Sequence, residues 1–585
     1  MRLRRRIAAI TVALTLALGS VGLSATAEAH PRPPKPKDVE LQVLSFNDFH
    51  GHLQPPGGTV APLGTDATLG AALDPTNTEV GGAEYLASTL DRLRAKAQYS
   101  QTVAAGDLIG GTPFLSGLFH DEPAVESLNA MGLDVSGVGN HEFDEGVTEL
   151  LRMQRGGCHP VDGCYEPWGK RGYPGADFPW LAANVVRERT GRTVLPGTWV
   201  TKVQGVKVGY IGMTLEDTPT LVSQSGIQGI EFRDEVETAN RAARDLRRRG
   251  VETIIVLLHE GGLQSGTYQQ CKGVSGPIVD IAENLSASID LVVTGHTHQP
   301  YVCNIPDPAG HARMVTSASS FGRVVTETNL TLDRRTGDVR RNKTTSTNHL
   351  VTRTVKDPDQ TEIIDRWEAA SAPIGNKVVG SIAASLTRSP NRDTESTMAN
   401  VIADAQLAAT AAPADGGAQI ALMNPGGVRA DLTYGQISGG EQPGQVTYGE
   451  AFAVQPFGNL LVTMDLTGAQ LHDLLEQQAV QGRPGGRDVL ILGVSAGFTF
   501  AYDPARDPGD RIDPASIQLN DTPVAPGITY RIVTNSFLAD GGDAFTVFRE
   551  GTNRVGGGDD LAALTDYLGG PNAPIAPPAD RIAGI

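Results

Sequence analysis

Short apolar runs that end in polar residues recur through the first half of the chain. Between them lie stretches with helical spacing: residues 83–98 put Leu86, Leu90 and Leu93 on one stripe, and residues 124–131 form a second helical segment. The runs have the length and β-branched content of buried strands, and they cover residues 39–46, 102–106, 135–138, 253–258 and 289–294. This alternation of strands and helices predicts an α/β domain, which a strand-rich stretch at residues 330–350 closes.

The second half of the chain has a different pattern. Residues 357–370 place Ile363, Ile364 and Trp367 on one side of an amphipathic helix, which we interpret as a linker. A helical stretch and several β-like runs follow it, at residues 398–411, 419–423, 460–464 and 530–534. Because 585 residues are too many for one ordinary core, we predict two domains, the second of them mixed α+β. The predicted segments are 30–354 for the first domain, 355–376 for the linker helix, 377–570 for the smaller second domain and 571–585 for a tail.

The N-terminus has the order of a secretory signal. Arginines at positions 2 and 4–6 precede an apolar run at residues 7–18, and small residues follow around Ala27 and Ala29. We expect residues 1–29 to be removed and the protein to be secreted or associated with the cell wall. A membrane anchor is the alternative, but the apolar run is much shorter than the ~20 residues that span a bilayer, and no second apolar span follows.

Charge limits the classes of partner. The formal net charge is −18, and removal of residues 1–29, which contain four Arg and one Glu, changes it to −21. An acidic surface excludes broad binding to nucleic-acid polymers. An anionic substrate must therefore meet a local positive pocket or metal ions.

Four cysteines are an even number in a chain that we expect to be exported, which predicts two disulfides. Three pairings are possible, and we favour near neighbours, Cys158 with Cys164 and Cys271 with Cys303. A zinc site is the alternative, but the paired Cys-x-x-Cys spacing that such a site prefers is absent from the sequence.

Polar clusters follow five of the predicted strands. They contain Asp48 and His50, then Asp107, then Asn140 with His141 and Asp144, then His259, and finally His296 with His298. In open α/β sheets, ligands bind outside the carboxyl ends of the strands. One cluster alone is equally well explained as a polar cap, but five together predict a single site. Their carboxylates, amide oxygen and imidazoles suit two zinc, manganese or iron ions better than calcium.

The same segments resemble the calcineurin-like metallophosphoesterases and, more narrowly, the exported bacterial type of the 5′-nucleotidase family. The resemblance rests on residues 47–51, 106–107, 139–142, 259 and 295–298, and it continues in the second domain. It implies an α/β/β/α sandwich domain followed by a smaller mixed α+β substrate-binding domain. It also implies two divalent ions, one held by Asp48, His50, Asp107 and His298 and the other by Asp107, Asn140, His259 and His296. Asp107 would bridge the ions, and His298 stands where some relatives carry glutamine.

The resemblance assigns catalysis to His141, with Asp144 as the carboxylate that orients it. An imidazolium beside the ions can stabilise the charge that develops on the phosphoryl oxygens, while water activated by the ions attacks phosphorus. Glu142 and His52, which lie in the same motifs, receive no role.

Motifs of the second domain match residues with which the family binds its substrate. Asn424 and Arg429 lie in a glycine-rich turn, and Phe457 and Phe537 match two rings that sandwich a nucleobase. The alternative for the two rings is an ordinary place in the core. The remaining matches are Asp543, as an acceptor for ribose hydroxyls, and Arg388 and Arg392, which resemble phosphate-contacting arginines in a loop of variable length.

Taken together, these features predict an enzyme that hydrolyses nucleoside 5′-monophosphates to nucleoside and phosphate. Two activities of the same site are alternatives: a 2′,3′-cyclic-nucleotide phosphodiesterase, and a hydrolase of UDP-sugars or nucleoside diphosphates. A non-catalytic nucleotide-binding surface protein is an alternative of another class. The presence of His141, Asp144 and a complete set of metal ligands argues against it.

Overall fold

The computed structural model describes residues 38–56, 80–222, 224–483, 487–578 and 580–585. The expected signal segment, residues 1–29, lies outside the described residues. Among the helices of the described part, none combines the length and the apolar content needed to cross a membrane.

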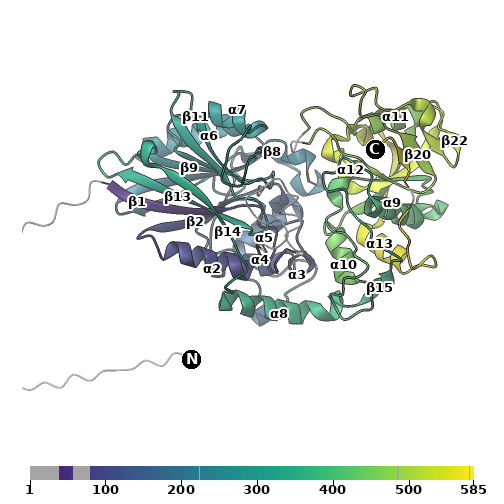
Figure 1. Cartoon of the computed structure of the whole chain (residues 1–585), viewed down its shortest axis with the longest axis horizontal. Helices are drawn as coiled ribbons and strands as arrows, with labels where there is room; N and C mark the ends of the chain where they lie inside the picture. The colour runs from purple at the N-terminus through teal and green to yellow at the C-terminus, as the bar shows by residue number, and fades with distance from the viewer. Residues whose placement is uncertain (1–37, 57–79, 223, 484–486, 579) are drawn as a thin grey trace, which may run out of the picture. The chain divides into compact units, whose positions relative to one another are not determined.

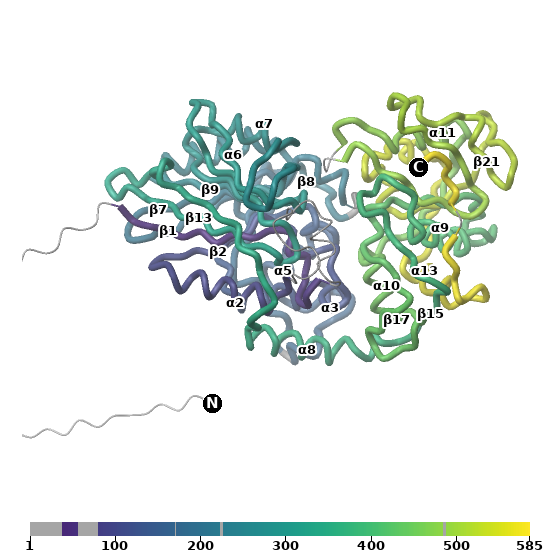
Figure 2. Tube along the Cα trace, viewed as in Figure 1, coloured from purple at the N-terminus to yellow at the C-terminus, as the bar shows by residue number. Residues whose placement is uncertain are grey.

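Two six-stranded sheets form the N-terminal domain (Figure 1). The first has the order β14 (Thr345–Leu350), β13 (Val324–Asp333), β1 (Asp38–Phe46), β2 (Ser100–Ala105), β3 (Val135–Gly137) and β4 (Trp180–Leu181). The second has the order β11 (Tyr301–Pro306), β12 (Ala312–Ser317), β10 (Leu291–Thr294), β9 (Thr253–His259), β7 (Val206–Thr214) and β6 (Thr198–Val203). β1 is parallel to β2 and antiparallel to β13, so segments far apart in the sequence lie side by side (Figure 2).

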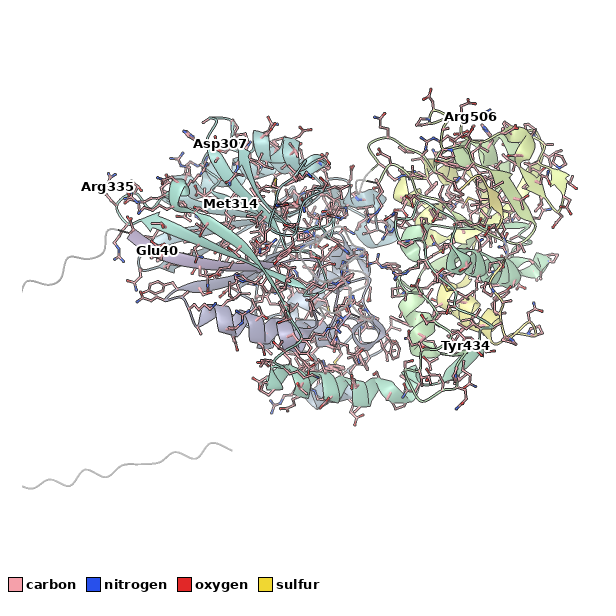
Figure 3. All side chains as sticks on the ribbon, viewed as in Figure 1. Glu40, Asp307, Met314, Arg335, Tyr434 and Arg506 are labelled. Atoms are coloured by element: carbon pink, nitrogen blue, oxygen red, sulfur yellow. A yellow bond between two sulfur atoms is a disulfide. The ribbon has the colours of Figure 1, made fainter. Side chains whose placement is uncertain are left out.

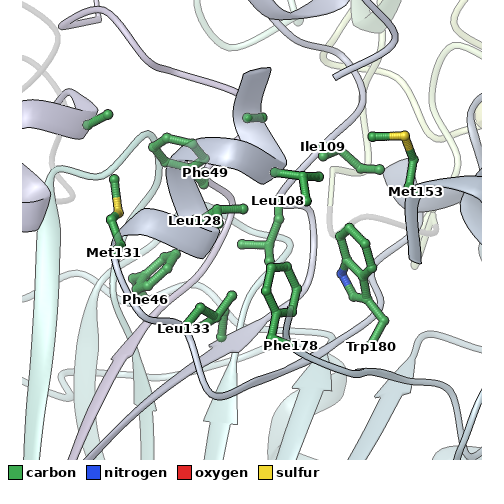
Figure 4. Close-up of a cluster of buried hydrophobic side chains, with 14 of the residues drawn as sticks. Phe46, Phe49, Leu108, Ile109, Leu128, Met131, Leu133, Met153, Phe178 and Trp180 are labelled. Atoms are coloured by element: carbon green, nitrogen blue, oxygen red, sulfur yellow. The ribbon is translucent and has the colours of Figure 1, made fainter. Parts of the chain in front are cut away.

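Alternate side chains of β1 enter two different cores, because successive residues of a strand face opposite sides of the sheet. Leu41 and Val43 belong to the layer between the two sheets, which also contains Met314 of β12 (Figure 3). Leu44 and Phe46 belong to the core on the outer side of the first sheet (Figure 4). The apolar run of residues 39–46 is therefore buried on both faces.

Helices cover the outer face of each sheet. α2 (Ala83–Arg94), α4 (Glu122–Ala130) and α5 (Gly146–Arg155) pack in the core of the first sheet, near the short α3 (Phe114–Gly117). α6 (Glu235–Arg248) and α7 (Pro277–Asn284) pack in the core of the second sheet. Helices, two stacked sheets and helices again make the α/β/β/α sandwich, which confirms the fold predicted for this domain.

The C-terminal domain follows α8 (Pro358–Gly375), the helix predicted as a linker. Its larger sheet has the order β19 (Gly493–Val494), β16 (Ile420–Met423), β23 (Thr529–Asn535), β18 (Leu460–Thr467) and β24 (Thr552–Asp559). The helices of this domain are α9 (Thr397–Thr410), α10 (Tyr448–Val454), α11 (Gly468–Glu476), α12 (Ser536–Ala539) and α13 (Asp560–Leu568). Mixed strands with helices match the predicted α+β class.

A smaller sheet completes the domain, with the order β22 (Thr522–Pro523), β21 (Gln518–Leu519), β20 (Phe498–Ala501) and β25 (Ile582–Ala583). β25 lies within residues 571–585, which we predicted as a tail. It pairs in parallel with β20, and Ile582 is buried in the domain core. The last residues are therefore part of the C-terminal domain.

Both disulfides join near neighbours, Cys158 to Cys164 and Cys271 to Cys303. This confirms the favoured pairing. The first closes a short loop after α5, and the second ties the loop before α7 to β11.

Candidate active site

The predicted strand-end clusters meet at one edge of the two sheets. β1, β2 and β3 are parallel neighbours in one sheet, and β9 and β10 are parallel neighbours in the other, so their carboxyl ends share this edge. Asp48 and His50 follow β1, Asp107 follows β2, Asn140 follows β3, His259 ends β9, and His296 and His298 follow β10.

These side chains form two adjoining groups, in each of which the potential ligand atoms lie within 4.8 Å of one another. The groups are Asp48, His50 and His298, and Asp107, His259 and His296. Asn140 joins the second group, because its Oδ1 lies 3.1 Å from Nδ1 of His296. Oδ2 of Asp107 lies 3.6 Å from Nε2 of His50 and 2.9 Å from Nε2 of His259. This carboxylate therefore faces both groups, as a bridging ligand must.

The backbone of the site is unusual at several ligand positions. Asp48, Asp107 and His296 have φ values of 50°, 50° and 71°, in the left-handed region that non-glycine residues rarely adopt. Gly106 and Gly139 allow two ligand loops to approach, since a Cβ on Gly106 would lie 2.4 Å from the backbone nitrogen of Gly139. Strained residues persist only where the surrounding structure fixes them, and they concentrate at functional sites.

The residues fit a pair of divalent metal ions. Nε2 of His50 and Nε2 of His296 are buried and have no hydrogen-bond partner among the described residues, and the buried Nε2 of His259 faces Oδ2 of Asp107 at 2.9 Å. Nδ1 of His50 lies 2.8 Å from the carbonyl oxygen of Gly110, and Nδ1 of His259 lies 2.7 Å from that of Ala105. Such bonds place the proton on Nδ1 and leave the Nε2 lone pair for a metal. The mixture of imidazole nitrogen with carboxylate and amide oxygen suits zinc, manganese or iron.

His141 and Asp144 lie beside this centre: His141 begins a 3-10 turn, η1 (His141–Phe143), and Asp144 directly follows it. Nδ1 of His141 lies 2.8 Å from Oδ2 of Asp144, and its ring is 4.9 Å from the ring of His50. Burial lowers the pKa of the His141 imidazole, but the carboxylates of Asp144 and Asp107 more than offset this and raise it above its ordinary value. Asp144 and Asp107 therefore favour the protonated form of the His141 ring, whose Nε2 is not engaged by Asp144 and lies next to the potential metal ligands.

A cavity of about 820 Å³ connects this pair with the C-terminal domain. A Cβ placed on Gly111 would lie 3.3 Å from Nη2 of Arg429, 3.3 Å from the Phe457 ring and 3.4 Å from the His141 ring, so these three side chains converge. The Phe457 ring stacks on that of His141 at 5.8 Å, and the Arg429 guanidinium lies 5.5 Å from the Phe457 ring. The predicted residues that line the cavity are Asp107, Asn140, His141, Asp144, His296, His298, Arg392, Asn424, Arg429, Phe457, Phe537 and Asp543.

Polar contacts fix the side chains at the end of the cavity that the C-terminal domain forms. Nδ2 of Asn424 donates to Oδ2 of Asp543 at 2.9 Å, and its Oδ1 accepts from Asn535. Burial, together with the nearby Arg487 and Arg429, lowers the pKa of Arg392 to about 9. Positive charge is therefore concentrated here, as binding of an anionic substrate requires.

Arg388 is placed differently from the other predicted residues, because it does not line the cavity. Its Nε lies 3.1 Å from Oδ1 of Asp431, and its Nη1 donates to the backbone carbonyl of Arg429 at 2.5 Å. Arg388 thus supports the turn that carries Arg429 rather than facing the cavity itself.

Glu142, for which no role was predicted, ties the metal-ligand loops together. Its carboxylate accepts from the backbone N–H groups of Asp107 at 2.9 Å and Leu108 at 2.8 Å, and also from that of Gly139. Its place in the motif at residues 139–144 was a signal of importance, but two of its three partners, Asp107 and Leu108, come from another strand end and were not visible in the sequence.

Phe321 is a second residue that sequence reasoning missed. Its ring lies 5.8 Å from that of His50, 5.2 Å from that of His298 and 4.0 Å from that of His52. Its backbone N–H donates to the carbonyl of Asp48 at 2.7 Å. Phe321 therefore covers one side of the first ligand group, and His52 packs on Phe321 without joining either group.

Comparisons with known proteins agree with this geometry. The family model for calcineurin-like phosphoesterase matches residues 41–300, and that for the 5′-nucleotidase C-terminal domain matches residues 375–550. The cell wall protein Lmo0130 of Listeria monocytogenes is 31% identical over 581 residues, which cover 94% of this chain and 69% of that protein. Endonuclease YhcR of Bacillus subtilis is also 31% identical, over 92% of this chain but only 40% of its own length.

A solved structure matches the whole fold. The crystal structure of a 5′-nucleotidase precursor from Thermus thermophilus superposes with a TM-score of 0.72. The two sequences are 26% identical, and the match covers 94% of this chain and 99% of that one. Both domains therefore have their counterparts in one known protein.

Proposed function

We propose that this chain, which belongs to the 5′-nucleotidase family of metal-dependent phosphoesterases, hydrolyses nucleoside 5′-monophosphates to nucleoside and phosphate. The observation that carries the proposal is the position of His141. Its ring touches the ligand group at His50 on one side and Phe457 of the C-terminal domain on the other. One nucleotide would therefore place its phosphoryl group at the metal-ligand groups and its base beside Phe457.

The residues of the centre fit two divalent ions, held by Asp48, His50, Asp107 and His298 and by Asp107, Asn140, His259 and His296. Zinc, manganese or iron would suit this mixture of nitrogen and oxygen ligands. When bound, such ions lower the pKa of water and neutralise the charge of a phosphoryl group.

His141 acts on the transition state. Because Nδ1 is held by Asp144, Nε2 is left to donate to a phosphoryl oxygen, on which negative charge is concentrated during the transfer. Asp144 keeps the ring in one orientation and favours its protonated form. Arg429, which lies over the Phe457 ring, contributes a further positive charge beside His141.

The C-terminal domain selects the leaving group. We assign Phe537 and Phe457 to the nucleobase, because aromatic rings stack on any base face. Asn424 and Asp543 meet at 2.9 Å, and the Asp543 carboxylate offers acceptors to ribose hydroxyls. Arg392 supplies positive charge at the same end of the cavity, while Arg388 acts only through Arg429.

We also propose that the protein is exported. Two disulfides suit an oxidising compartment, and one relative is named as a cell wall protein. The predicted signal segment at residues 1–29 is consistent with this location.

Product formation from a substrate panel, resolved by chromatography, tests the proposed activity. Chromatography is needed because cleavage of UDP-glucose gives UMP and glucose 1-phosphate, and cleavage of 2′,3′-cyclic AMP gives a nucleoside monophosphate, so neither reaction releases inorganic phosphate. We expect AMP to have the highest kcat/KM among AMP, ADP, UDP-glucose and 2′,3′-cyclic AMP, with Mn²⁺ or Zn²⁺ present. A preference for UDP-glucose or the cyclic nucleotide would replace monophosphate hydrolysis with one of the alternative activities. Binding of AMP without hydrolysis under any metal condition would indicate a nucleotide-binding protein.

A further inference from the structure

A second group of imidazoles and carboxylates lies outside the dinuclear centre. His120 lies between α3 and α4, and Glu145 immediately precedes α5. His159 and Asp162 lie in the loop that the Cys158–Cys164 disulfide closes. None of the four takes part in the mechanism above.

We propose that His120, His159 and Asp162 bind one further divalent transition-metal ion, for which Zn²⁺ has the best-matched chemistry, and that Glu145 orients His120. Two imidazoles and a carboxylate are a ligand set that zinc accepts, with water in the fourth position. The site is separate from the two ions of the catalytic centre.

The donor groups lie close together. Potential ligand atoms of His120, Glu145 and His159 are within 4.8 Å of one another, and Asp162 lies beside both imidazoles. Oδ2 of Asp162 lies 2.7 Å from Nε2 of His120 and 3.3 Å from Nδ1 of His159. The two rings stack at 3.7 Å with their planes inclined by 21°. Ligand atoms around a tetrahedral zinc ion are about 3.3 Å apart, as follows from zinc–ligand distances of about 2.0–2.1 Å. The Asp162 oxygen therefore lies near ligand–ligand distance from both nitrogens. Because the lone pairs of two nearly parallel rings cannot point at one ion, binding requires one imidazole to turn about its Cβ–Cγ bond.

The two ring nitrogens that face Asp162 have different partners. Nδ1 of His120 lies 2.6 Å from Oε2 of Glu145. Glu145 can therefore accept a hydrogen bond from the Nδ1–H group and leave Nε2 for an ion. A carboxylate in this role is the usual companion of a zinc-bound histidine. Nδ1 of His159 accepts the backbone N–H of Asp162 at 3.1 Å, so this nitrogen is unprotonated, and an ion would have to replace that hydrogen bond.

The electrostatics of the cluster favour a cation. Burial lowers the pKa of His120, but Glu145 and Asp162 more than offset this and raise it to about 9. The carboxylates thus attract positive charge, which a proton on His120 or a bound ion can supply. Access is open, because the side chains of Glu145 and Asp162 are 44% and 50% exposed, whereas those of His120 and His159 are 19% and 13% exposed.

The location links the site to the active centre. His120 and Glu145 line the same cavity as His141 and Asp144, and Glu145 directly follows Asp144 in the chain. An ion at this position would lie at the edge of the catalytic cavity without sharing a ligand with the dinuclear centre.

The experiment measures zinc content in the full chain and its variants. Each protein is stripped with a chelator, dialysed against an excess of Zn²⁺, freed of unbound ion and analysed by elemental mass spectrometry. We expect His159→Ala to hold one zinc ion per chain fewer than the wild type. His311→Ala is the matched control, because His311 is a 75% exposed histidine 3.8 Å from the carboxylate of Asp307, and it should retain the wild-type zinc content.

Asp162→Asn provides a second variant that preserves the shape of the loop, in case His159→Ala disturbs folding. It should also lose one ion, and added Zn²⁺ should raise its melting temperature less than that of the wild type. Equal zinc content in the wild type and both variants would overturn the proposal and leave the cluster as an ion pair of protonated His120. The comparison depends only on the difference between variants, so it stands even if the proposed nucleotidase activity fails.

Discussion

Replacement of His141 by alanine should lower kcat for AMP by about 10²–10³-fold, the usual cost of removing one preorganised donor to a transition-state charge. Metal content should stay at the wild-type value, because His141 lies beside the ligand groups and its Nδ1 is engaged by Asp144. Steady-state kinetics and elemental analysis of the same preparation measure the two quantities.

His52→Ala is the matched control for this experiment. Like His141, His52 is a half-buried histidine near the first ligand group, but its ring packs on Phe321 and does not line the cavity. Its kcat should remain close to that of the wild type. Turnover by His141→Ala at the wild-type rate would remove His141 from the mechanism, and a parallel loss of metal would make it a structural residue.

Replacement of Phe537 by alanine should raise KM for AMP by about five- to 150-fold, since loss of a stacked base costs about 1–3 kcal/mol. Hydrolysis of p-nitrophenyl phosphate, which has no base or ribose, should change little. The ratio of kcat/KM for the two substrates measures the effect. Phe457→Ala should raise KM for AMP as well, but because Phe457 stacks on His141 it should also reduce kcat for both substrates.

Phe452→Ala serves as the control for the stacking residues. Phe452 lines the same cavity, but its ring packs on Phe114 at 5.5 Å. Its replacement should affect both substrates alike. An equal loss on AMP and p-nitrophenyl phosphate in Phe537→Ala would show that Phe537 has a packing role rather than a place beside the base.

Much of the N-terminal domain could be predicted because its strands are short apolar runs with polar ends. The run at residues 39–46 is buried on both faces of β1, and Asp48 and His50 follow it directly. β7 (Val206–Thr214) escaped prediction although it lies next to β9 in the second sheet. It contains Gly209 and Gly212, which lower strand propensity, yet a Cβ on Gly212 would lie 2.4 Å from Cβ of Leu181. Close packing between the sheets, which no local pattern reveals, explains the glycine.

In the candidate site, too, some residues could be predicted from the sequence and others could not. The potential metal ligands could be found because each ends a strand and parallel pairing brings those ends together. Glu142, Phe321 and the support of Arg429 by Arg388 could not, because each depends on contacts between loops that are distant in sequence. Sequence identifies which chemical groups are present at the strand ends, whereas the support around them is set by tertiary packing.

Dependence of AMP hydrolysis on metal tests the central claim most directly. Protein stripped of metal by a chelator is titrated with Mn²⁺, and phosphate release and bound metal are measured at each step. The stripped protein should release no phosphate from AMP. Activity should reach its maximum when both positions of the dinuclear centre are filled, which in the Asp162→Asn variant corresponds to two ions per chain. Full activity after complete removal of metal, or no phosphate release at any Mn²⁺ concentration, would contradict the assignment.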